Sequence, residues 1–223
     1  MIICMANILS SEELGLIVDR LKNAEFVDGK LTAGWYAQQV KNNAQLKNDA
    51  APTQELRNLV NQALKRNSLF QIAARPKAIR PIMFSRYQGG MYYGTHIDNA
   101  IMGDEKLMRS DLSLTLFLSH PATYTGGELV IESTQGEQAF KLDAGSMVVY
   151  PTTTLHRVEP ITEGERLAAV TWVQSLVRDA HNREILFDLD TVRDTLFQKS
   201  GKTAEFDLLS KSIANLLRKW ADV

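Results

Sequence analysis

Apolar positions recur with a helical period over residues 1–76. Residues 10–13 have the Ser-x-x-Glu spacing of a capping box, and the apolar side chains of residues 14–21 then share one helical face. The same period predicts a second helix over residues 34–46 and a third that follows Pro52. The first third of the chain is therefore interpreted as an N-terminal helical support region.

The pattern changes over residues 77–178, where Gly and Pro separate short apolar segments. Strands are predicted at residues 79–87, 112–118, 128–132, 140–142, 146–150 and 166–177. Turns are predicted at residues 124–127, 143–145 and 163–164. Many short strands without helical segments between them favour a β barrel or sandwich over alternating α/β structure.

Residues 179–223 return to a helical period, and Ser200-Gly201 separates two amphipathic segments. Their apolar faces contain Ile185, Leu186, Leu189, Val192 and Leu196 in the first, and Leu209, Ile213, Leu216, Leu217 and Trp220 in the second. This pattern predicts an antiparallel helical pair that covers either the barrel or a partner subunit, so a homodimer contact through these helices is one expectation.

Composition narrows the class of protein. The 223 residues include 25 basic and 26 acidic side chains, which is too balanced for a dedicated nucleic-acid-binding protein. No apolar run approaches the roughly 18 residues of a membrane span, and residues 1–9 lack the basic region and cleavage site of a signal peptide. We therefore expect a cytoplasmic protein without a membrane partner. Cys4, the single cysteine, is expected to be a small buried hydrophobe.

Three polar residues in the predicted β region have the spacing of a metal site. His96 and Asp98 are two residues apart, so in an extended segment they face the same way. His156 follows several predicted strands later, enough for the chain to wind round a barrel and return. Two histidines and one carboxylate in this order are typical of the facial triad that binds non-haem Fe(II). Taken alone, the His96 and Asp98 pair is better explained by a histidine beside an acid on a surface strand, and His156 alone fits a surface position at a strand end. His120 and His181 are expected to be solvated.

Arg166 adds a second indication of chemistry. It begins a predicted strand, and the apolar residues 167–170 follow it, so we expect its guanidinium to be buried. A buried guanidinium needs an anionic partner, and its fork fits a carboxylate with two hydrogen bonds. Without the metal triad, a structural ion pair would be the better explanation. With the triad, the distal carboxylate of 2-oxoglutarate is the better one.

Several motifs together resemble one enzyme family. These are RYQGGMYYGTHID (86–98), YTGGELVIE (124–132), LDAGSMVVYP (142–151) and LHRVEPITEGERLAAVTWVQS (155–175). They resemble the iron(II)/2-oxoglutarate-dependent dioxygenases of the prolyl 4-hydroxylase type, and within these the bacterial PKHD-type hydroxylases. TAGWYAQQVKNNAQL (32–46) and the C-terminal helices are also similar to that group, so the resemblance extends over essentially the whole chain.

The resemblance implies a mainly β core with flanking helices (α+β), in which the core is a double-stranded β-helix, or jelly roll, over residues 77–178. It implies Fe(II) ligands at His96, Asp98 and His156, and 2-oxoglutarate at Arg166. Weaker implications concern the co-substrate pocket. Its further residues are Tyr87, Val158 and Trp172, although core packing explains each of them nearly as well. Leu112 stands where some prolyl hydroxylases have a second tyrosine.

The activity that the resemblance implies is hydroxylation of an unactivated C–H bond. Molecular oxygen and 2-oxoglutarate are consumed, succinate and CO2 are released, and L-ascorbate is a further expected cofactor. Two substrate classes are compatible with the resemblance. One is a peptidyl prolyl or lysyl residue, and the other is a small molecule linked to iron uptake. A jelly-roll metal-binding regulator without turnover is the main alternative, although it leaves Arg166 without a role. A purely structural dimer leaves the whole set of polar residues unexplained.

Overall fold

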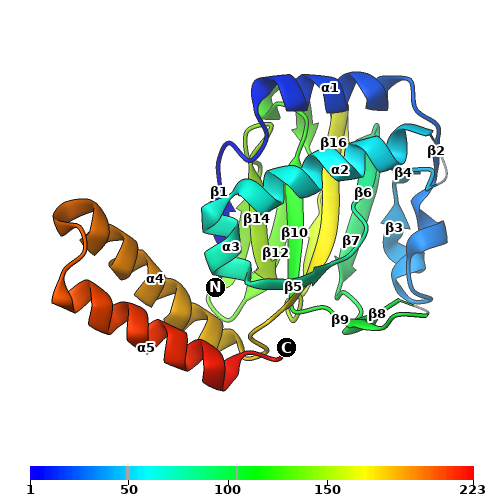
Figure 1. The fold of residues 1–223 in the computed structure, drawn as a ribbon. Helices are drawn as coiled ribbons and strands as arrows, with labels where there is room; N and C mark the ends of the chain where they lie inside the picture. Colours follow the sequence, from blue (N-terminus) through cyan, green and yellow to red (C-terminus); the bar gives the residue numbers. More distant parts are fainter. Residues whose placement is uncertain (49–50, 104) are drawn as a thin grey trace.

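The computed structural model describes residues 1–48, 51–103 and 105–223, and two facing antiparallel sheets form its centre (Figure 1). Nine strands of the described residues form the larger sheet: β1 (Ile3–Met5), β2 (Phe26–Asp28), β4 (Ala44–Leu46), β5 (Pro76–Ile79), β6 (Met83–Gln88), β10 (Leu112–Phe117), β11 (Tyr124–Gly126), β14 (Met147–Pro151) and β16 (Ile161–Ser175). Their order is β1-β14-β10-β16-β6-β4-β2, and β5 and β11 also pair with β16.

The smaller sheet has the order β13-β12-β15-β7-β3. Its strands are β3 (Lys41–Asn42), β7 (Tyr92–His96), β12 (Leu129–Ser133), β13 (Gly136–Phe140) and β15 (His156–Val158). A separate hairpin pairs β8 (Ile101–Met102) with β9 (Met108–Arg109). The two facing sheets are the jelly-roll core that was predicted, and the space between them is where the functional residues meet.

Strand β10 explains how both faces of the larger sheet are covered. Leu114 and Leu116 join a core cluster with the N-terminal helices, whereas Phe117 belongs to the cluster between the two sheets. Because neighbouring residues of a strand point to opposite faces, Ser113 and Thr115 also point between the sheets. All six residues of β10 are buried, as the apolar character of both its faces predicted.

The N-terminal helices cover the outer face of the larger sheet (Figure 1). They are α1 (Ser11–Lys22), α2 (Ala51–Arg66) and α3 (Ser68–Ala74). The predicted capping box of α1 is confirmed, since Ser10 Oγ accepts a hydrogen bond from the Glu13 amide at 3.2 Å and Glu13 Oε2 accepts one from the Ser10 amide at 2.9 Å. Leu56, Val60 and Leu64 of α2 are fully buried against the sheet, as their spacing indicated.

The predicted helix over residues 34–46 is wrong. The chain instead forms two 3-10 turns, η1 (Gly29–Thr32) and η2 (Ala37–Val40), and then strands β3 and β4. β3 pairs with β7 of the smaller sheet, and β4 pairs with β6 of the larger one. Both partners offer unpaired backbone groups at a sheet edge, and pairing there outweighs a weak helical period. The N-terminal region is thus less helical than expected.

Smaller differences have local causes. The single strand expected over residues 79–87 is divided between β5 and β6, because Pro81 has no amide hydrogen for a ladder bond. The turn expected at residues 163–164 lies inside β16, where Gly164 has a φ of 76° in a pair with Tyr124. Cys4 is exposed rather than buried, because on β1 it is Met5 that points into the core.

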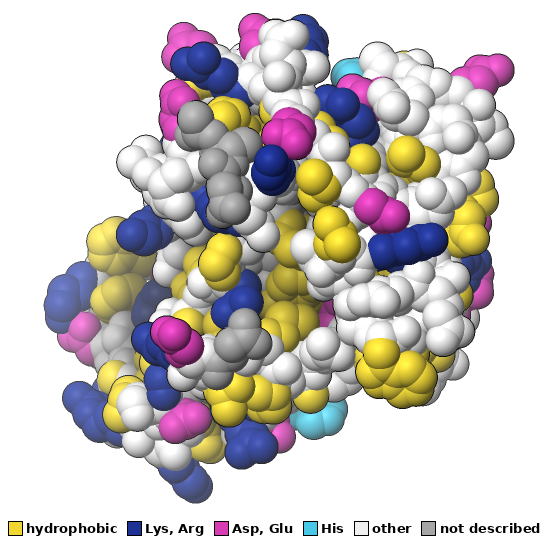
Figure 2. Space-filling view, turned by 90° about the vertical axis from the view of Figure 1, so that its right-hand side faces the viewer, with side chains coloured by type: hydrophobic (Ala, Val, Ile, Leu, Met, Phe, Trp, Pro, Cys, Tyr) yellow, Lys and Arg dark blue, Asp and Glu magenta, His cyan; other side chains and the backbone are white. Residues whose placement is uncertain are grey.

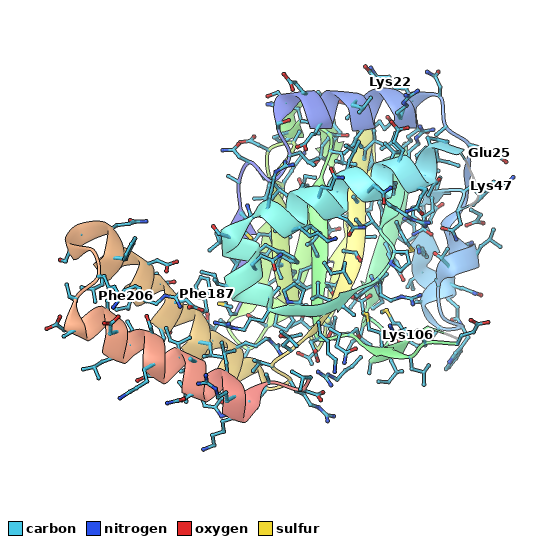
Figure 3. All side chains as sticks on the ribbon, in the orientation of Figure 1. Lys22, Glu25, Lys47, Lys106, Phe187 and Phe206 are labelled. Carbon is cyan, nitrogen blue, oxygen red and sulfur yellow. The ribbon has the colours of Figure 1, made fainter. Side chains whose placement is uncertain are left out.

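The C-terminal pair, α4 (Ala180–Ser200) and α5 (Ala204–Trp220), projects from one end of the core (Figure 1). Leu186 and Ile213 are buried between the helices, so part of the predicted leucine face is covered. Asp190 of α4 forms an ion pair with Arg75 next to α3. Phe187 packs against the main core, whereas Phe206 lies farther out along the pair (Figure 3).

The outer surface of the pair stays apolar in places, since Ile185, Val192, Phe197 and Leu208 are 45 to 57% exposed. A short η3 turn (Pro121–Thr123) completes the secondary structure of the described residues. Among these residues, no helix has the length and apolar character needed to cross a membrane.

Candidate metal centre and active-site cavity

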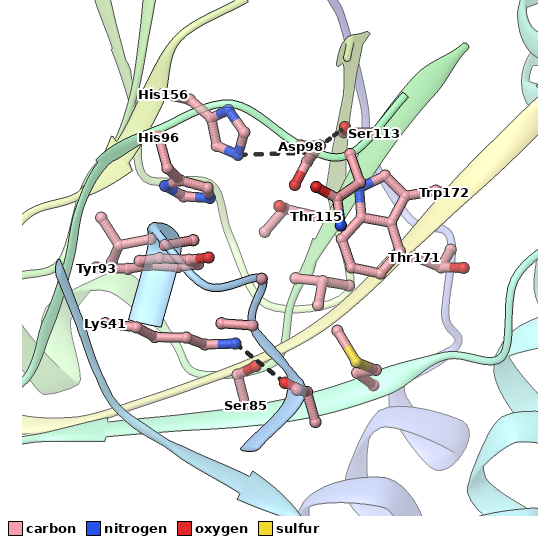
Figure 4. Close-up of a pocket in the computed structure, with 18 of the residues that line it drawn as sticks. Lys41, Ser85, Tyr93, His96, Asp98, Ser113, Thr115, His156, Thr171 and Trp172 are labelled. Carbon is pink, nitrogen blue, oxygen red and sulfur yellow. Dashed lines mark hydrogen bonds and ion pairs between the residues drawn. The ribbon is translucent and has the colours of Figure 1, made fainter. Parts of the chain in front are cut away.

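His96, Asp98 and His156 lie together between the two sheets. His96 ends β7 and His156 begins β15, and the two residues are direct partners in the sheet register. Asp98 follows β7 by two residues and turns toward them, so that His156 Nε2 lies 3.7 Å from Asp98 Oδ2. One ligand atom from each residue lies within 4.8 Å of the other two. The structure thus brings together the three residues that the sequence singled out (Figure 4).

Neighbouring groups hold each of these side chains. His96 Nδ1 lies 2.8 Å from the Gly94 carbonyl oxygen, and His156 Nδ1 lies 3.2 Å from that of Thr154. Each Nδ1 then carries the hydrogen and donates it, which leaves Nε2 with its lone pair for a metal. Ser113 Oγ donates a hydrogen bond of 2.6 Å to Asp98 Oδ2. The partners of the three side chains therefore set their orientation.

The protonation state of His96 also suits a metal ligand. Burial, together with the neighbouring His156, lowers the pKa of His96 to about 4. The imidazole is therefore neutral at neutral pH, which is the form that binds a metal. Two imidazole nitrogens and one carboxylate are the donor set of non-haem Fe(II) sites with open coordination positions, so the residues present fit that ion.

The three side chains face a cavity of about 650 Å³ that opens where residues 32–37 meet residues 97–103. Figure 2 views this side of the molecule, which is hollowed near its middle, with hydrophobic side chains inside the hollow. The cavity volume lies within the range typical of small-molecule sites, roughly 300–1,000 Å³. The metal site is consequently accessible to a co-substrate and a further molecule.

Arg166 lines the same cavity from β16 and is 1% exposed. Its Cζ lies 5.1 Å from the Tyr87 ring centroid and 5.3 Å from that of Phe117. Among the described residues, neither its Nε nor its Nη2 has a hydrogen-bond partner, and its guanidinium forms no ion pair. A buried cation without a counter-charge is unfavourable by itself, so this site fits the carboxylate of an incoming molecule.

The three residues weakly predicted for the pocket also line the cavity. Tyr87 is the register partner of Arg166, and burial raises the pKa of its hydroxyl while the Arg166 charge lowers it. Val158 pairs with Tyr93 on the smaller sheet. Trp172 is half-buried, and its indole Nε1 has no hydrogen-bond partner among the described residues. His120 and His181 are exposed, as expected.

Sequence reasoning missed further polar residues of the cavity, among them Lys41, Ser113, Thr115 and Tyr150. Leu112, considered for the inner end of the pocket, packs instead in the core under the N-terminal helices. Tyr150, on the neighbouring strand β14, lines the cavity, and burial raises its pKa well above the usual value. Strand alternation could have found Ser113 and Thr115, whereas Lys41 lay in the segment wrongly predicted as a helix.

Comparisons with known proteins define the class. Residues 82–174 match the model of the 2OG-Fe(II) oxygenase superfamily, and residues 179–222 match that of the PKHD-type hydroxylase C-terminal domain. A prolyl-4-hydroxylase from Pseudomonas putida shares the fold with a TM-score of 0.52 at 20% identity, over 78% of this chain and 92% of that one. HygX from Streptomyces hygroscopicus gives a TM-score of 0.55 at 12% identity, over 78% and 82%. The fold and the matched family models are those of the Fe(II)- and 2-oxoglutarate-dependent oxygenases.

Full-length relatives narrow the assignment. A PKHD-type hydroxylase from Gloeothece citriformis is 60% identical, and one from Synechococcus sp. (strain JA-3-3Ab) is 58% identical, in both cases over 100% of each chain. The chain therefore belongs to the PKHD-type hydroxylases. Its reaction is the 2-oxoglutarate-dependent hydroxylation that was expected from the motifs.

Proposed function

We propose that His96, Asp98 and His156 hold the Fe(II), and that Arg166 binds the distal carboxylate of 2-oxoglutarate. The observation that carries this proposal is a buried guanidinium, in the same cavity as the three ligands, whose Nε and Nη2 have no hydrogen-bond partner among the described residues. When bound, Fe(II) and 2-oxoglutarate supply oxygen activation and the two electrons that hydroxylation of a C–H bond requires. The protein supplies position, charge and exclusion of water.

The neighbouring side chains have supporting roles in this proposal. Ser113 fixes the Asp98 carboxylate through the hydrogen bond to Oδ2, the oxygen that lies 3.7 Å from His156 Nε2. Tyr87 and Val158 form apolar walls for the carbon chain of 2-oxoglutarate, and the Tyr87 hydroxyl is available to its distal carboxylate. Trp172, on the larger sheet with Tyr87, also lines the cavity and offers its indole N–H to a ligand.

We propose that the chain works as a catalytic core of residues 77–178, supported by residues 1–76 and by residues 179–223. The protein is proposed to act in the cytoplasm. L-Ascorbate is proposed to sustain turnover by keeping the metal reduced, as the family resemblance implies. Ascorbate-free turnover that continues at a constant rate would contradict that requirement.

The substrate remains a choice between two classes. One structural relative is a prolyl-4-hydroxylase, and another was crystallised with hygromycin B bound. The fold therefore accommodates both peptidyl and small-molecule substrates, and it does not select between them. A cavity of about 650 Å³ holds 2-oxoglutarate together with a side chain or a compact small molecule.

A homodimer through the C-terminal helices is proposed from their exposed apolar side chains, of which Val192 and Leu208 are each 57% exposed. Changing both residues to Lys in the full-length chain should convert a dimer to a monomer in sedimentation equilibrium. A wild-type chain that sediments as a monomer at micromolar concentration would contradict the proposal.

The test of the enzymatic proposal is succinate formation from 2-oxoglutarate by the purified wild-type protein. Succinate should form only when Fe(II) and oxygen are both present, even without the primary substrate, because uncoupled turnover needs only the groups assigned above. Tight Fe(II) binding without any succinate would instead favour the metal-binding regulator.

A further inference from the structure

The cavity contains a second buried cation that the reaction with 2-oxoglutarate does not use. Lys41, at the start of β3, lines the cavity and is 4% exposed. Among the described residues, no carboxylate is in ion-pair contact with its amine, although Asp98 and Asp28 act on it electrostatically. A buried ammonium without an acid in contact is unfavourable, so its position calls for a ligand.

The contacts of Lys41 leave part of its ammonium free. Nζ donates to Thr32 Oγ1 at 3.2 Å, and the Thr32 hydroxyl in turn donates to Gln45 Oε1. Nζ also lies 5.0 Å from the centroid of the Tyr93 ring. An ammonium has three hydrogens, and among the described residues only Thr32 accepts one in a hydrogen bond. Two donors remain for a molecule in the cavity.

Tyr93 fixes how far this amine lies from the metal ligands. Its ring stacks on His96 with centroids 3.6 Å apart, and Lys41 approaches the ring from the other side (Figure 4). The amine is thus separated from a metal ligand by the thickness of one aromatic ring. A molecule that reaches Lys41 therefore lies in the same cavity as the three metal ligands.

2-Oxoglutarate does not account for this cation. In the proposed function, one of its carboxylates binds the metal and the other binds Arg166, which lies deeper in the cavity, between Tyr87 and Phe117. Both charges of the co-substrate are then matched. Among the described residues that line the cavity, Asp98 is the one acidic residue, and in the proposed function the metal uses it. The Lys41 charge therefore remains for a third component.

The cavity mouth indicates the rest of that component. Ile97 and Ile101 line the opening and are 40% and 55% exposed. Apolar side chains at the mouth and an unpaired cation inside fit a molecule with an apolar portion and an anionic group.

We propose that Lys41 binds a carboxylate of the primary substrate and so positions the substrate for hydroxylation. The inference rests on the proposed function, because it assumes that Arg166 binds 2-oxoglutarate. It restricts the substrate to a carboxylic acid with an apolar part, such as an acylated amino acid or the carboxyl end of a peptide.

The test uses two probes that differ only in charge, N-acetyl-L-leucine and N-acetyl-L-leucinamide. Each is titrated calorimetrically into protein loaded with Fe(II) and 2-oxoglutarate, without oxygen so that no turnover occurs. The carboxylate should bind at least about tenfold more tightly than the amide, the ratio that corresponds to about 1.4 kcal/mol. Lys41→Met should bring the ratio close to one, and Lys41→Arg should retain part of it.

Two further variants keep the test decisive. Lys30→Met removes an exposed lysine of the neighbouring η1 turn and should keep the wild-type ratio. Thr32→Val keeps the ammonium but removes the hydroxyl that orients it, so the affinity ratio should fall partway toward one. This variant provides the test if Lys41→Met folds poorly. A wild-type protein without preference for the carboxylate, or a Met variant that keeps the preference, would overturn the proposal.

A 2-oxoglutarate titration on the same samples separates two failures. If 2-oxoglutarate binds normally and the probes show no preference, only the assignment of Lys41 is wrong. If Lys41→Met weakens the binding of 2-oxoglutarate as much as the binding of N-acetyl-L-leucine, Lys41 binds the co-substrate, and the assignment to the primary substrate is wrong. If the wild-type protein with Fe(II) does not bind 2-oxoglutarate, the proposed function itself fails.

Discussion

Two groups of polar side chains face the cavity, and they differ in how the protein satisfies them. His96, Asp98 and His156 each have a partner that fixes their orientation, either a backbone carbonyl or the Ser113 hydroxyl. Arg166 and Lys41 are also buried, but among the described residues neither is in ion-pair contact with an acid. The first group is therefore preorganised for a metal ion. The second consists of charges that the protein leaves for anionic molecules.

The largest effect is expected at the preorganised group. His96→Ala or His156→Ala should abolish Fe(II) binding and succinate formation, because the two remaining ligands cannot hold the ion firmly. The fold should persist, since the sheets have their own cores. Equilibrium dialysis and circular dichroism would measure both. Asp98→Ala should be nearly as severe.

His120→Ala is a matched control, because His120 is exposed and its Nδ1 accepts a hydrogen bond from the Ala122 amide away from the cavity. That variant should bind Fe(II) as the wild type does. Normal Fe(II) binding by both His96→Ala and His156→Ala would show that the metal centre lies elsewhere.

The next effect concerns the first unpaired cation. Arg166→Ala should weaken 2-oxoglutarate binding by about 30-fold to several thousand-fold, since truncating one partner of a buried charge pair costs about 2–5 kcal/mol. Arg166→Lys should lose less, because it keeps the charge but not the guanidinium fork. Titrations of the metal alone, and of 2-oxoglutarate with the metal present, would separate the two sites.

Arg157 offers the comparison for Arg166, because it already pairs with Glu137 at 2.8 Å and Glu159 at 2.7 Å outside the cavity. Arg157→Ala should leave the 2-oxoglutarate affinity unchanged. A folded Arg166→Ala protein with wild-type 2-oxoglutarate affinity would instead support the metal-binding regulator.

A pH dependence is expected at the second unpaired cation. Burial lowers the pKa of Lys41 from 10.5 to about 8, although Asp98 and Asp28 act in the opposite direction. Between pH 8 and 10.5 the unfolded chain holds a proton that the folded chain has lost, so the Lys41 contribution to stability increases as pH rises. The increase should be on the order of 3 kcal/mol, from about 1.36 kcal/mol per pKa unit.

Urea unfolding of metal-free wild-type and Lys41→Met proteins would measure this contribution. The stability of the wild type relative to the variant should rise between pH 8 and 10.5 and stay constant just below pH 8. Parallel pH profiles for the two proteins would indicate that Lys41 is solvated or paired.

The smallest effect is expected at a partner of the preorganised group. Ser113→Ala removes the hydrogen bond to Asp98 Oδ2 and should lower Fe(II) affinity by about 10- to 100-fold without abolishing it. Ser212→Ala, at an exposed position of α5, should leave metal binding unchanged. A Ser113→Ala protein with unchanged Fe(II) affinity would show that Asp98 needs no such support.

Features that depend on residues close together in the chain could be predicted from the amino-acid sequence. The capping box of α1 depends on residues three apart, and the strand over residues 112–117 is indicated by a continuous run of apolar and small polar residues. The spacing of His96, Asp98 and His156 and the apolar residues after Arg166 pointed to the cavity, where the structure places all four. A polar side chain on a buried strand needs a ligand or a polar partner, because water cannot solvate it there. The position of these four residues at a binding site was therefore predictable.

The remaining side chains that line the cavity could be identified only from the tertiary structure. Lys41 came from a segment with a weak helical period, and the edges of β7 and β6 draw that segment into strands β3 and β4. Tyr150, rather than Leu112, faces the cavity because the register of β10 and β14 sets which residues point between the sheets. Strand pairing joins residues that are far apart in the chain, and a periodic pattern within one segment contains no information about its partner.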